Sequence, residues 1–176
     1  EVFRQASASL IVRNAHRINQ GQMPVLPDVA AGEEVEYFAV TATSGAETER
    51  LVVEFVCERL PRTFGLDPRR DIQVLSPMRV REGGADSINR LLQERLNPDG
   101  KPVGRGEGAL RIGDRVMQLR NDYDKSVYNG DIGWIVRWNP QEKAVVVTFD
   151  EREVTYALNE LDDLSLSYAS TVHKAQ

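Results

Sequence analysis

The sequence ends on Leu164-Ser165-Leu166-Ser167-Tyr168-Ala169-Ser170-Thr171-Val172-His173-Lys174-Ala175-Gln176, where an apolar, strand-like run passes directly into a polar cluster. Thr171, His173, Lys174 and Gln176 carry groups that can all contact a phosphate. The first N–H groups of a helix lack intrahelical partners and attract an anion, so this arrangement predicts a phosphate-binding turn after a strand. A lone histidine is usually structural, but four such groups in six residues favour a functional site. Because the sequence stops inside this cluster, we expect a piece of a longer protein.

Composition places the chain among ordinary globular proteins. Its 176 residues, 41% of them hydrophobic, suffice for one domain or two small ones. No apolar run approaches the roughly 18 residues of a membrane span, and the sequence, which begins at Glu1 rather than Met, shows no signal peptide. The single cysteine, Cys57, excludes an internal disulfide, and the distant His16 and His173 disfavour a zinc site. We therefore expect no metal, no membrane contact and a cytoplasmic location.

Charge is segregated along the chain. The net charge of −5 argues against a protein held on nucleic acid by overall charge. Residues 101–125 nevertheless carry six Lys or Arg against four acids, whereas residues 141–165 carry seven acids against Lys143 and Arg152. A polyanion is therefore expected to touch the first stretch and to avoid the second.

The first hundred residues predict alternating helices and strands. Apolar spacing indicates a helix from Leu10 to Ile18 that Gly21 can end, and Ser44 and Glu47 fit a capping box before a helix over residues 45–60. Val35–Thr41 is strand-like, Asp71–Leu75 predicts a buried strand, and Ala85–Leu96 predicts a third helix. This alternation is typical of an α/β fold with a parallel sheet.

After residue 108 the pattern changes to short strands joined by turns. The predicted strands are Arg115–Arg120, Asp131–Trp138, Ala144–Phe149 and Glu153–Ala157, with Asn129-Gly130 as one of the turns. We interpret them as an antiparallel meander, in the form of a small barrel that closes its own edges. Leu164–Ala169 is then expected to return to the parallel sheet, which makes the barrel an insertion.

Several motifs are candidates for chemistry, each with a plainer interpretation. Arg4, with Gln5, lies where an arginine can reach a triphosphate, although most arginines are simply exposed. Ser76-Pro77-Met78-Arg79 follows a predicted strand, where ligands of α/β sheets bind, or is merely a loop. Asn121 and Tyr123, with Arg120, can bind single-stranded nucleic acid, or they belong to an ordinary barrel turn. Trp134 and Trp138, four apart on one face, favour core packing over base stacking.

The sequence lacks the phosphate-binding motif that nucleotide hydrolysis usually requires. There is no Gly-x-x-x-x-Gly-Lys-Ser/Thr loop, no clear strand followed by an Asp-Glu pair, and no Gly-x-Ser-x-Gly elbow. The chain is therefore not expected to assemble an ATP hydrolysis site by itself.

Four motifs in order resemble the second motor lobe of RecD-like superfamily 1 DNA helicases. They are Glu1-Val2-Phe3-Arg4-Gln5, Val74-Leu75-Ser76-Pro77-Met78-Arg79, Gly113–Gln118 with Asn121-Asp122-Tyr123 and Asn129–Gly133, and Leu166–Gln176. The resemblance implies a RecA-like lobe with an inserted SH3-like barrel. It places the first part of the lobe at 1–108, the barrel at 109–161, and the return to the lobe at 162–176, cut within the family's motif V.

The resemblance also implies roles for individual residues. Arg4 resembles the arginine that senses the γ-phosphate and stabilises its transfer, with Gln5 beside it in the nucleotide cleft. The DNA-contacting positions would be Ser76, Pro77, Arg79, Asn121, Tyr123, Thr171, His173 and Lys174. ATP and Mg²⁺ would serve the intact motor, and the fragment alone would bind neither.

The chain is expected to be a fragment of an ATP-dependent DNA helicase that moves 5′ to 3′. Its partners would be single-stranded DNA and a missing P-loop lobe, and whether it also binds nuclease-helicase subunits is left undecided. Two alternatives remain. One is a non-enzymatic nucleic-acid or protein-binding module, which the acidic pI of about 5.2 supports. The other is part of a conjugative relaxase-helicase.

Overall fold

The computed structural model describes residues 9–26, 37–103 and 109–174. The chain divides into two compact units, Glu1–Thr41 and Ala42–Gln176, and each is described by itself. Among the described residues, no helix combines the length and the apolar character needed to cross a membrane.

Among its described residues, the first unit contains the helix α1 (Leu10–Asn19), which Ser9 caps at its start. The Ser9 Oγ accepts a hydrogen bond from the Ile11 N–H at 3.2 Å. Residues 37–41 lie in no strand, so the strand expected over residues 35–41 is wrong for these five positions. Aromatic and β-branched residues favour strands, but a strand also needs a neighbour that supplies ladder hydrogen bonds.

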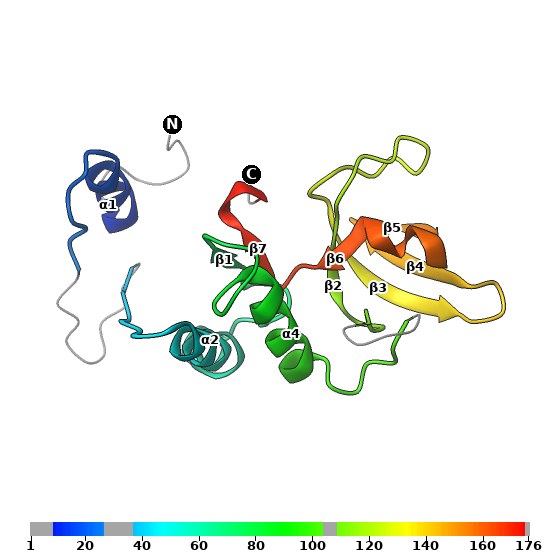
Figure 1. The fold of residues 1–176 in the computed structure, drawn as a ribbon, viewed down its shortest axis with the longest axis horizontal. Coiled ribbons are helices and arrows are strands. Elements are labelled where there is room, and N and C mark those ends of the chain that lie inside the picture. Colours follow the sequence, from blue (N-terminus) through cyan, green and yellow to red (C-terminus); the bar gives the residue numbers. More distant parts are fainter. Residues whose placement is uncertain (1–8, 27–36, 104–108, 175–176) are drawn as a thin grey trace. The chain divides into compact units, whose positions relative to one another are not determined.

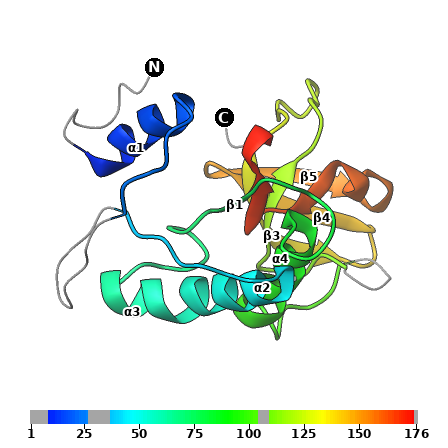
Figure 2. The same ribbon diagram turned by 60° about the vertical axis from the view of Figure 1, so that its left-hand side comes forward.

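The second unit opens with a long helical rod, which Figure 2 shows as nearly continuous. It consists of α2 (Gly45–Glu54), a wider π turn (Phe55–Arg59) and α3 (Leu60–Phe64). The Ser44 Oγ accepts from the Glu47 N–H at 3.1 Å, which confirms the predicted start. Pro61 has no N–H to donate to the preceding turn, and the wider turn accommodates this loss.

A two-stranded parallel sheet lies beside the rod and α4 (Ala85–Leu96) (Figure 1). Its strands are β1 (Val74–Ser76) and β7 (Ala169–Thr171), with Ser76 opposite Thr171. The strand expected to be buried over Asp71–Leu75 starts later, and Leu75 is 50% exposed because the described sheet has only two strands. The core of this part consists of Val56, Ala85, Ile88, Leu92, Tyr168 and Ala169.

A five-stranded antiparallel sheet forms the rest of the unit, in the order β5-β4-β3-β2-β6. Its strands are β2 (Arg115–Gln118), β3 (Ile132–Asn139), β4 (Ala144–Phe149), β5 (Arg152–Ala157) and β6 (Leu164–Leu166). The first four confirm the predicted meander. Alternate side chains fill one core, which includes Val116, Ile135, Val145, Val147, Val154 and Tyr156.

The strand expected over Leu164–Ala169 is divided between the two sheets. Leu164–Leu166 pairs antiparallel with β2, whereas Ala169–Thr171 pairs parallel with β1. The chain therefore crosses from one sheet to the other within two residues. The domain boundaries at 108/109 and 161/162 stay predictions.

Trp134 and Trp138 do not share a face, contrary to the period-two expectation. The pairing of β3 with β4 shifts register between Ile135 and Arg137. An extra residue in one strand reverses the alternation beyond it. Trp138 accordingly packs against the core, while the Trp134 ring centre lies 5.6 Å from the Arg70 guanidinium carbon.

Candidate nucleic-acid interface

Two of the predicted site segments begin side by side at the carboxyl ends of the parallel strands. Ser76 ends β1 and Thr171 ends β7, and the two residues are register partners. Ser76–Arg79 and Thr171–Lys174, almost a hundred residues apart in sequence, therefore leave the sheet at one edge. Ligand-contacting residues of open α/β sheets gather at such an edge.

Ser76 shapes the loop that follows it. The side chain is buried, and its Oγ lies 2.9 Å from both the Met78 and Gly83 carbonyl oxygens and 3.3 Å from the Met78 N–H. A hydroxyl donates one hydrogen bond at a time, so these groups already occupy it. Ser76 thus positions the loop, whereas Pro77 and Arg79 are exposed.

The start of α4 offers little free anion-binding capacity in its backbone. The N–H groups of Ala85 and Asp86 donate to the carbonyls of Met78 and Arg79, each at 3.0 Å. A side chain at Gly84 would not fit, because its Cβ would lie 2.6 Å from the Arg79 oxygen. Any attraction for a phosphate at this edge must therefore come from side chains.

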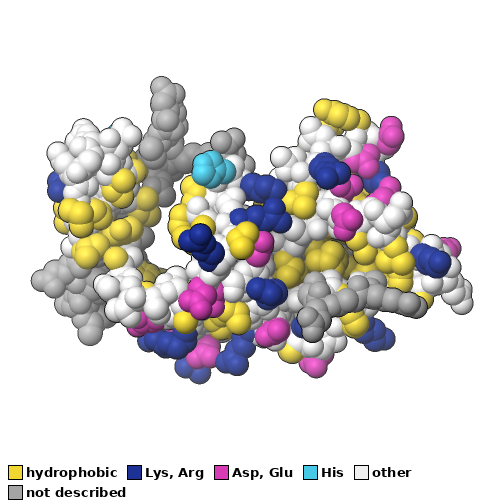
Figure 3. All heavy atoms as spheres, in the orientation of Figure 1, with side chains coloured by type: hydrophobic (Ala, Val, Ile, Leu, Met, Phe, Trp, Pro, Cys, Tyr) yellow, Lys and Arg dark blue, Asp and Glu magenta, His cyan; other side chains and the backbone are white. Residues whose placement is uncertain are grey.

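Arg79, Thr171 and Lys174 line one small pocket between α4, β2 and the end of β7. Arg79 pairs with Asp86 at 3.2 Å across exposed side chains, so this ion pair contributes little and leaves the arginine available. Within residues 9–26, 37–103 and 109–174, no ion pair involves Lys174. Figure 3 shows Lys and Arg side chains gathered beside a histidine on this face.

His173 belongs to the same segment but does not line the pocket. It is exposed within the short 3-10 turn Val172–Lys174 that follows β7. An exposed imidazole here can contact a nucleic-acid strand that runs past the pocket. Thr171 and Lys174, in contrast, line the pocket itself.

Asn121 and Tyr123 lie together in the loop between β2 and β3, apart from that pocket. The Asn121 Oδ1 accepts from the Asn129 N–H at 2.9 Å, and its Nδ2 lies 3.4 Å from the Tyr123 hydroxyl. Tyr123 is 73% exposed and meets Tyr128, 47% exposed, edge to face with ring centres 6.1 Å apart. Sequence reasoning missed Tyr128. Two tyrosines that flank a tight turn were the available signal.

Lys125 holds this loop against the body of the antiparallel sheet. Its Nζ lies 3.0 Å from Asp122 and 2.7 Å from Glu160, and 5.3 Å from the centre of the Tyr156 ring. Burial opposes its charge, but the hydrogen bonds to Glu160 and Asp122 prevail and raise the pKa of Lys125. The hydrogen bond from Lys125 lowers the pKa of Glu160, and the Lys125 backbone N–H lowers that of Asp122. The exposed tyrosines thus stand on an anchored loop.

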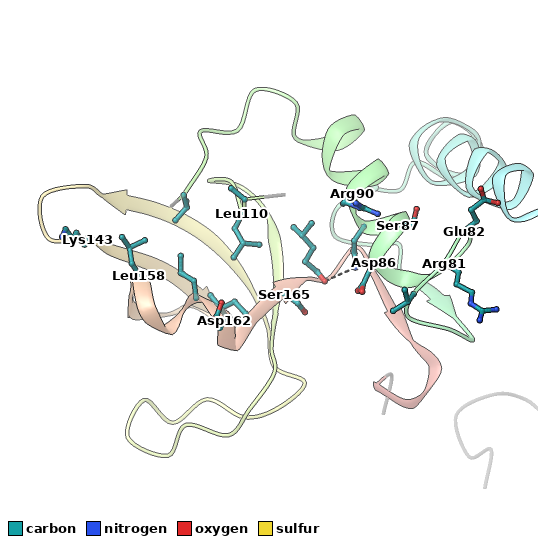
Figure 4. A pocket seen from close by; sticks show the side chains of 17 residues that line it. Arg81, Glu82, Asp86, Ser87, Arg90, Leu110, Lys143, Leu158, Asp162 and Ser165 are labelled. Carbon is teal, nitrogen blue, oxygen red and sulfur yellow. Dashed lines mark hydrogen bonds between the residues drawn. The ribbon is translucent and has the colours of Figure 1, made fainter. Parts of the chain in front are cut away.

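A wider groove separates α4 from the antiparallel sheet, and none of the predicted site residues lines it. Figure 4 shows Arg81, Asp86 and Arg90 on one side and Lys143, Leu158 and Asp162 on the other. Its mixed charges favour no particular ligand. Val103 and Ala109 also border it, and the residues between them lie outside the described ranges.

The predicted nucleotide site falls largely outside the described structure. Arg4 and Gln5, which make up that site, are not among the described residues, and neither is Gln176 of the terminal cluster. In the part of the chain that the structure describes, no group of three or more His, Cys, Asp or Glu is arranged to hold a metal ion. The described residues therefore offer no carboxylate cluster that fits Mg²⁺.

Comparison with known proteins confirms the resemblance to RecD-like helicases. Residues 88–149 match the family described as the SH3 domain of ATP-dependent RecD-like DNA helicases. The whole chain is 32% identical to the ATP-dependent RecD2 DNA helicase of Deinococcus radiodurans, of which it covers 22%. Over 94% of its length it is 26% identical to the RecBCD enzyme subunit RecD of Mycolicibacterium smegmatis, of which it covers 32%.

Solved structures agree on the fold. The chain resembles a Bacteroides Pif1 helicase crystallised with ADP-AlF3 and single-stranded DNA, with a TM-score of 0.54 and 18% identity. The match covers 100% of this chain and 42% of that one. The chain thus combines a mixed α/β part, which contains a parallel sheet, with an SH3-like antiparallel part, and it spans about a fifth to a third of its curated relatives.

Proposed function

We propose that this chain, whose residues 88–149 match the SH3 domain of ATP-dependent RecD-like DNA helicases, is part of such a helicase and supplies a section of its single-stranded DNA track. One observation carries the proposal. Arg79, Thr171 and Lys174, from two segments far apart in sequence, converge on one pocket at the ends of the parallel strands.

The chemistry of this pocket suits a phosphodiester backbone. Arg79 and Lys174 supply positive charge, and Thr171 supplies a hydroxyl that can donate to a phosphate oxygen. Contacts to phosphate carry no sequence information, which suits a protein that moves along any DNA. Because Asp86 already pairs with Arg79, an incoming phosphate replaces an exposed ion pair, whose net strength is small.

The exposed tyrosines supply a second, different kind of contact. Stacking on an aromatic ring tolerates every base. Tyr123 and Tyr128 stand in a loop with Asp122, Asp124 and Asp131, so this loop suits bases rather than phosphates. Phosphate contacts at the pocket and base contacts at the loop together would form the track.

The remaining parts of the proposal rest on the resemblance. Arg4, with Gln5, would stabilise the γ-phosphate during hydrolysis in the complete motor, and a P-loop lobe would supply the site for ATP and Mg²⁺. Movement would run 5′ to 3′, which duplexes with a 5′ or a 3′ single-stranded tail distinguish directly. Arg4→Ala in the full-length protein should abolish most ATP turnover. Turnover near the wild-type value would contradict this assignment.

The salt dependence of DNA binding tests the track. Each phosphate contact on single-stranded DNA contributes about 0.7 to the slope of log affinity against log salt. In the full-length protein, Lys174→Ala should weaken binding and reduce that slope by about 0.7. Lys143→Ala, on the turn between β3 and β4, is the matched control and should change neither. Equal effects of the two substitutions would exclude the pocket from the track.

The non-enzymatic module remains the second candidate, because the exposed aromatic pair Tyr123 and Tyr128 lies in an acidic loop. The full-length protein discriminates between the two. A helicase turns over ATP faster with single-stranded DNA, whereas a module binds without turnover. The isolated 176-residue chain should show negligible ATPase activity and weak, salt-sensitive DNA binding. Robust turnover by this chain alone would contradict both candidates.

A further inference from the structure

The chain enters and leaves the antiparallel sheet at one place. It enters through Arg111–Arg115, before and at the start of β2, and leaves through Leu166–Ala169, between β6 and β7. The two crossings lie side by side, because the Ser167 N–H donates to the Arg115 carbonyl at 2.9 Å. Any change in the orientation of this sheet must therefore pivot here.

A fully buried carboxylate, Asp114, stands at this place. Its Oδ1 accepts from the Asn97 side-chain amide at 2.7 Å and from the Tyr168 hydroxyl at 3.1 Å. Its Oδ2 accepts from the Gln93 side-chain amide at 2.6 Å and from the Arg111 N–H at 2.6 Å. Each oxygen thus has two donors, and the four come from α4 and its C-terminal cap, from the entering crossing and from the leaving crossing.

Asn89 holds the leaving crossing to the same helix. Its Nδ2 donates to the carbonyls of Leu166 and Ala169 at 3.1 and 2.8 Å, and its Oδ1 accepts from the Ala169 N–H at 2.8 Å. Asn89 and Asp114 therefore bind both sides of Tyr168 to α4. The strand that begins there, β7, ends at Thr171 and leads to Lys174.

Arg115 ties the entering crossing to the chain that leads into β1. Its buried guanidinium donates through Nη1 to the carbonyls of Arg69 and Ile72 at 3.3 and 3.1 Å. Burial lowers the pKa of Arg115, and burial together with the charge of Asp114 raises that of Tyr168. Tyr168 accordingly stays protonated throughout the physiological range, and its hydroxyl donates a hydrogen bond to Asp114.

We propose that Asp114 is a positioning residue. It fixes the orientation of the SH3-like sheet and of β7 relative to α4. Its effect reaches the DNA track through Tyr168, because β7 ends at Thr171 and leads to Lys174, while the loop between β2 and β3 carries Tyr123 and Tyr128. This inference rests on the proposed helicase function for its consequence, but its structural part does not. A fixed angle between the two groups of DNA contacts lets each ATP-driven step act on both together.

Asp114→Asn disrupts the hydrogen bonds at this position without changing the size or shape of the side chain. An amide nitrogen donates and cannot accept, so two of the four donors lose their acceptor in either orientation of the new side chain. Buried groups that lose their partners are costly, so the crossings should loosen. Tyr168→Phe removes one donor and keeps the ring. Asp99→Asn is the matched control, because Asp99 lies exposed in the turn after α4.

The first measurement is the spread of distances between fluorescent labels at positions 94 and 141 of the full-length protein, on α4 and on the turn between β3 and β4. Thermal melting first confirms that each variant is folded. The wild type and Asp99→Asn should give one narrow distribution, Tyr168→Phe a broader one, and Asp114→Asn the broadest. If Asp114→Asn fails to fold, Tyr168→Phe decides. An unchanged distribution in a folded variant would overturn the proposal.

The second measurement separates positioning from general damage. A loosened frame should leave ATP turnover stimulated by single-stranded DNA within about twofold of wild type, while base pairs opened per ATP fall at least fivefold. A proportional loss of both, or no loss in opening per ATP, would overturn the coupling. If the wild type neither hydrolyses ATP nor opens duplexes, the proposed function fails, and the distance distribution still decides whether Asp114 is the anchor.

Discussion

At the scale of single residues, chemical type was easier to predict than orientation. Thr171 and Lys174, predicted from their residue types to contact a phosphate, line one pocket, and Arg79 lines it as well. Ser76 has an equally suitable hydroxyl, but the loop carbonyls occupy it. The sequence offers no sign of this, because it depends on how residues 77–83 turn back over the strand.

Ser76→Ala should therefore affect stability more than DNA contact. The substitution leaves the Gly83 and Met78 carbonyls without this donor, at a cost of about 1–3 kcal/mol in the free energy of unfolding. Urea denaturation of the 176-residue chain measures it, with Ser87→Ala, on α4, as the control. In the full-length protein the salt slope of DNA binding should stay at its wild-type value. A reduced slope would show that Ser76 contacts a phosphate directly.

Lys125 makes the anchoring of its loop depend on pH. The pKa values of Asp122 and Glu160 are lowered from 3.8 and 4.5, so their contribution is present above those values and is lost as the pH falls through the lower folded ones. The pKa of Lys125 is raised from 10.5, so its contribution is full below that value and is lost as the pH rises through the higher folded one. Between pH 5 and 10 the anchor should be intact.

Lys125→Met tests this pH window, because it removes the charge and keeps an unbranched side chain of similar length. The difference in melting temperature between wild type and variant should be constant from about pH 5 to 10 and shrink below pH 4. The backbone amides next to Tyr123 and Tyr128 should lose protection from hydrogen exchange below about pH 4. A difference that stays constant down to pH 2 would show that the ion pairs do not anchor the loop.

At the scale of elements, local signals were reliable and pairing was not. The cap at Ser44 and the apolar spacing of Ala85–Leu96 were sufficient for the helices, since a helix makes its hydrogen bonds within itself. A strand depends on a partner elsewhere, so residues 37–41 were wrongly assigned. The bulge after Ile135, which separates the two tryptophans, also arises between strands.

The loop between β2 and β3 should act as an element, with both tyrosines contributing. In the full-length protein, Tyr128→Leu should weaken binding to single-stranded DNA about 5- to 150-fold, in keeping with about 1–3 kcal/mol for each stacked base. The salt slope should not change, because no phosphate contact is lost. Tyr128→Phe keeps the ring and should bind like wild type. Abasic DNA should bind wild type and Tyr128→Leu equally, and if the difference persisted, stacking would be excluded.

At the scale of the whole molecule, the order of elements was predictable and the meeting of the two sheets was not. Alternating helices and strands followed by a meander indicated an α/β part and a small antiparallel β part, and the family match supports the SH3-like character of the latter. The two-residue crossing at Ser167 and Tyr168 stayed hidden, because the apolar run Leu164–Ala169 looks continuous. Buried polar groups such as Asp114 and Asn89 were also missed, since their partners lie in other segments.

Gly133→Ala should disturb the antiparallel core as a unit. A Cβ there would lie 2.8 Å from the Thr148 carbonyl oxygen and from atoms of Phe149 and Val147. Such overpacking costs about 1–3 kcal/mol in the free energy of unfolding. Urea denaturation measures the loss, and Thr155→Ala, exposed on β5, provides a mild comparison. Equal stability of Gly133→Ala and wild type would mean that β3 and β4 separate easily.

The two-residue crossing has a consequence for the order in which the chain folds. β1 and β7 pair across 95 residues, as Val74 opposite Ala169 shows, and closing so long a loop is entropically unfavourable. The hairpins from β2 to β5 join neighbours in sequence and close rapidly. Once they have formed, β6 can pair with β2, and this shortens the remaining loop between β1 and β7, because only Ser167 and Tyr168 separate β6 from β7. Gly133→Ala should therefore slow the pairing of β1 with β7, although residue 133 lies in neither strand.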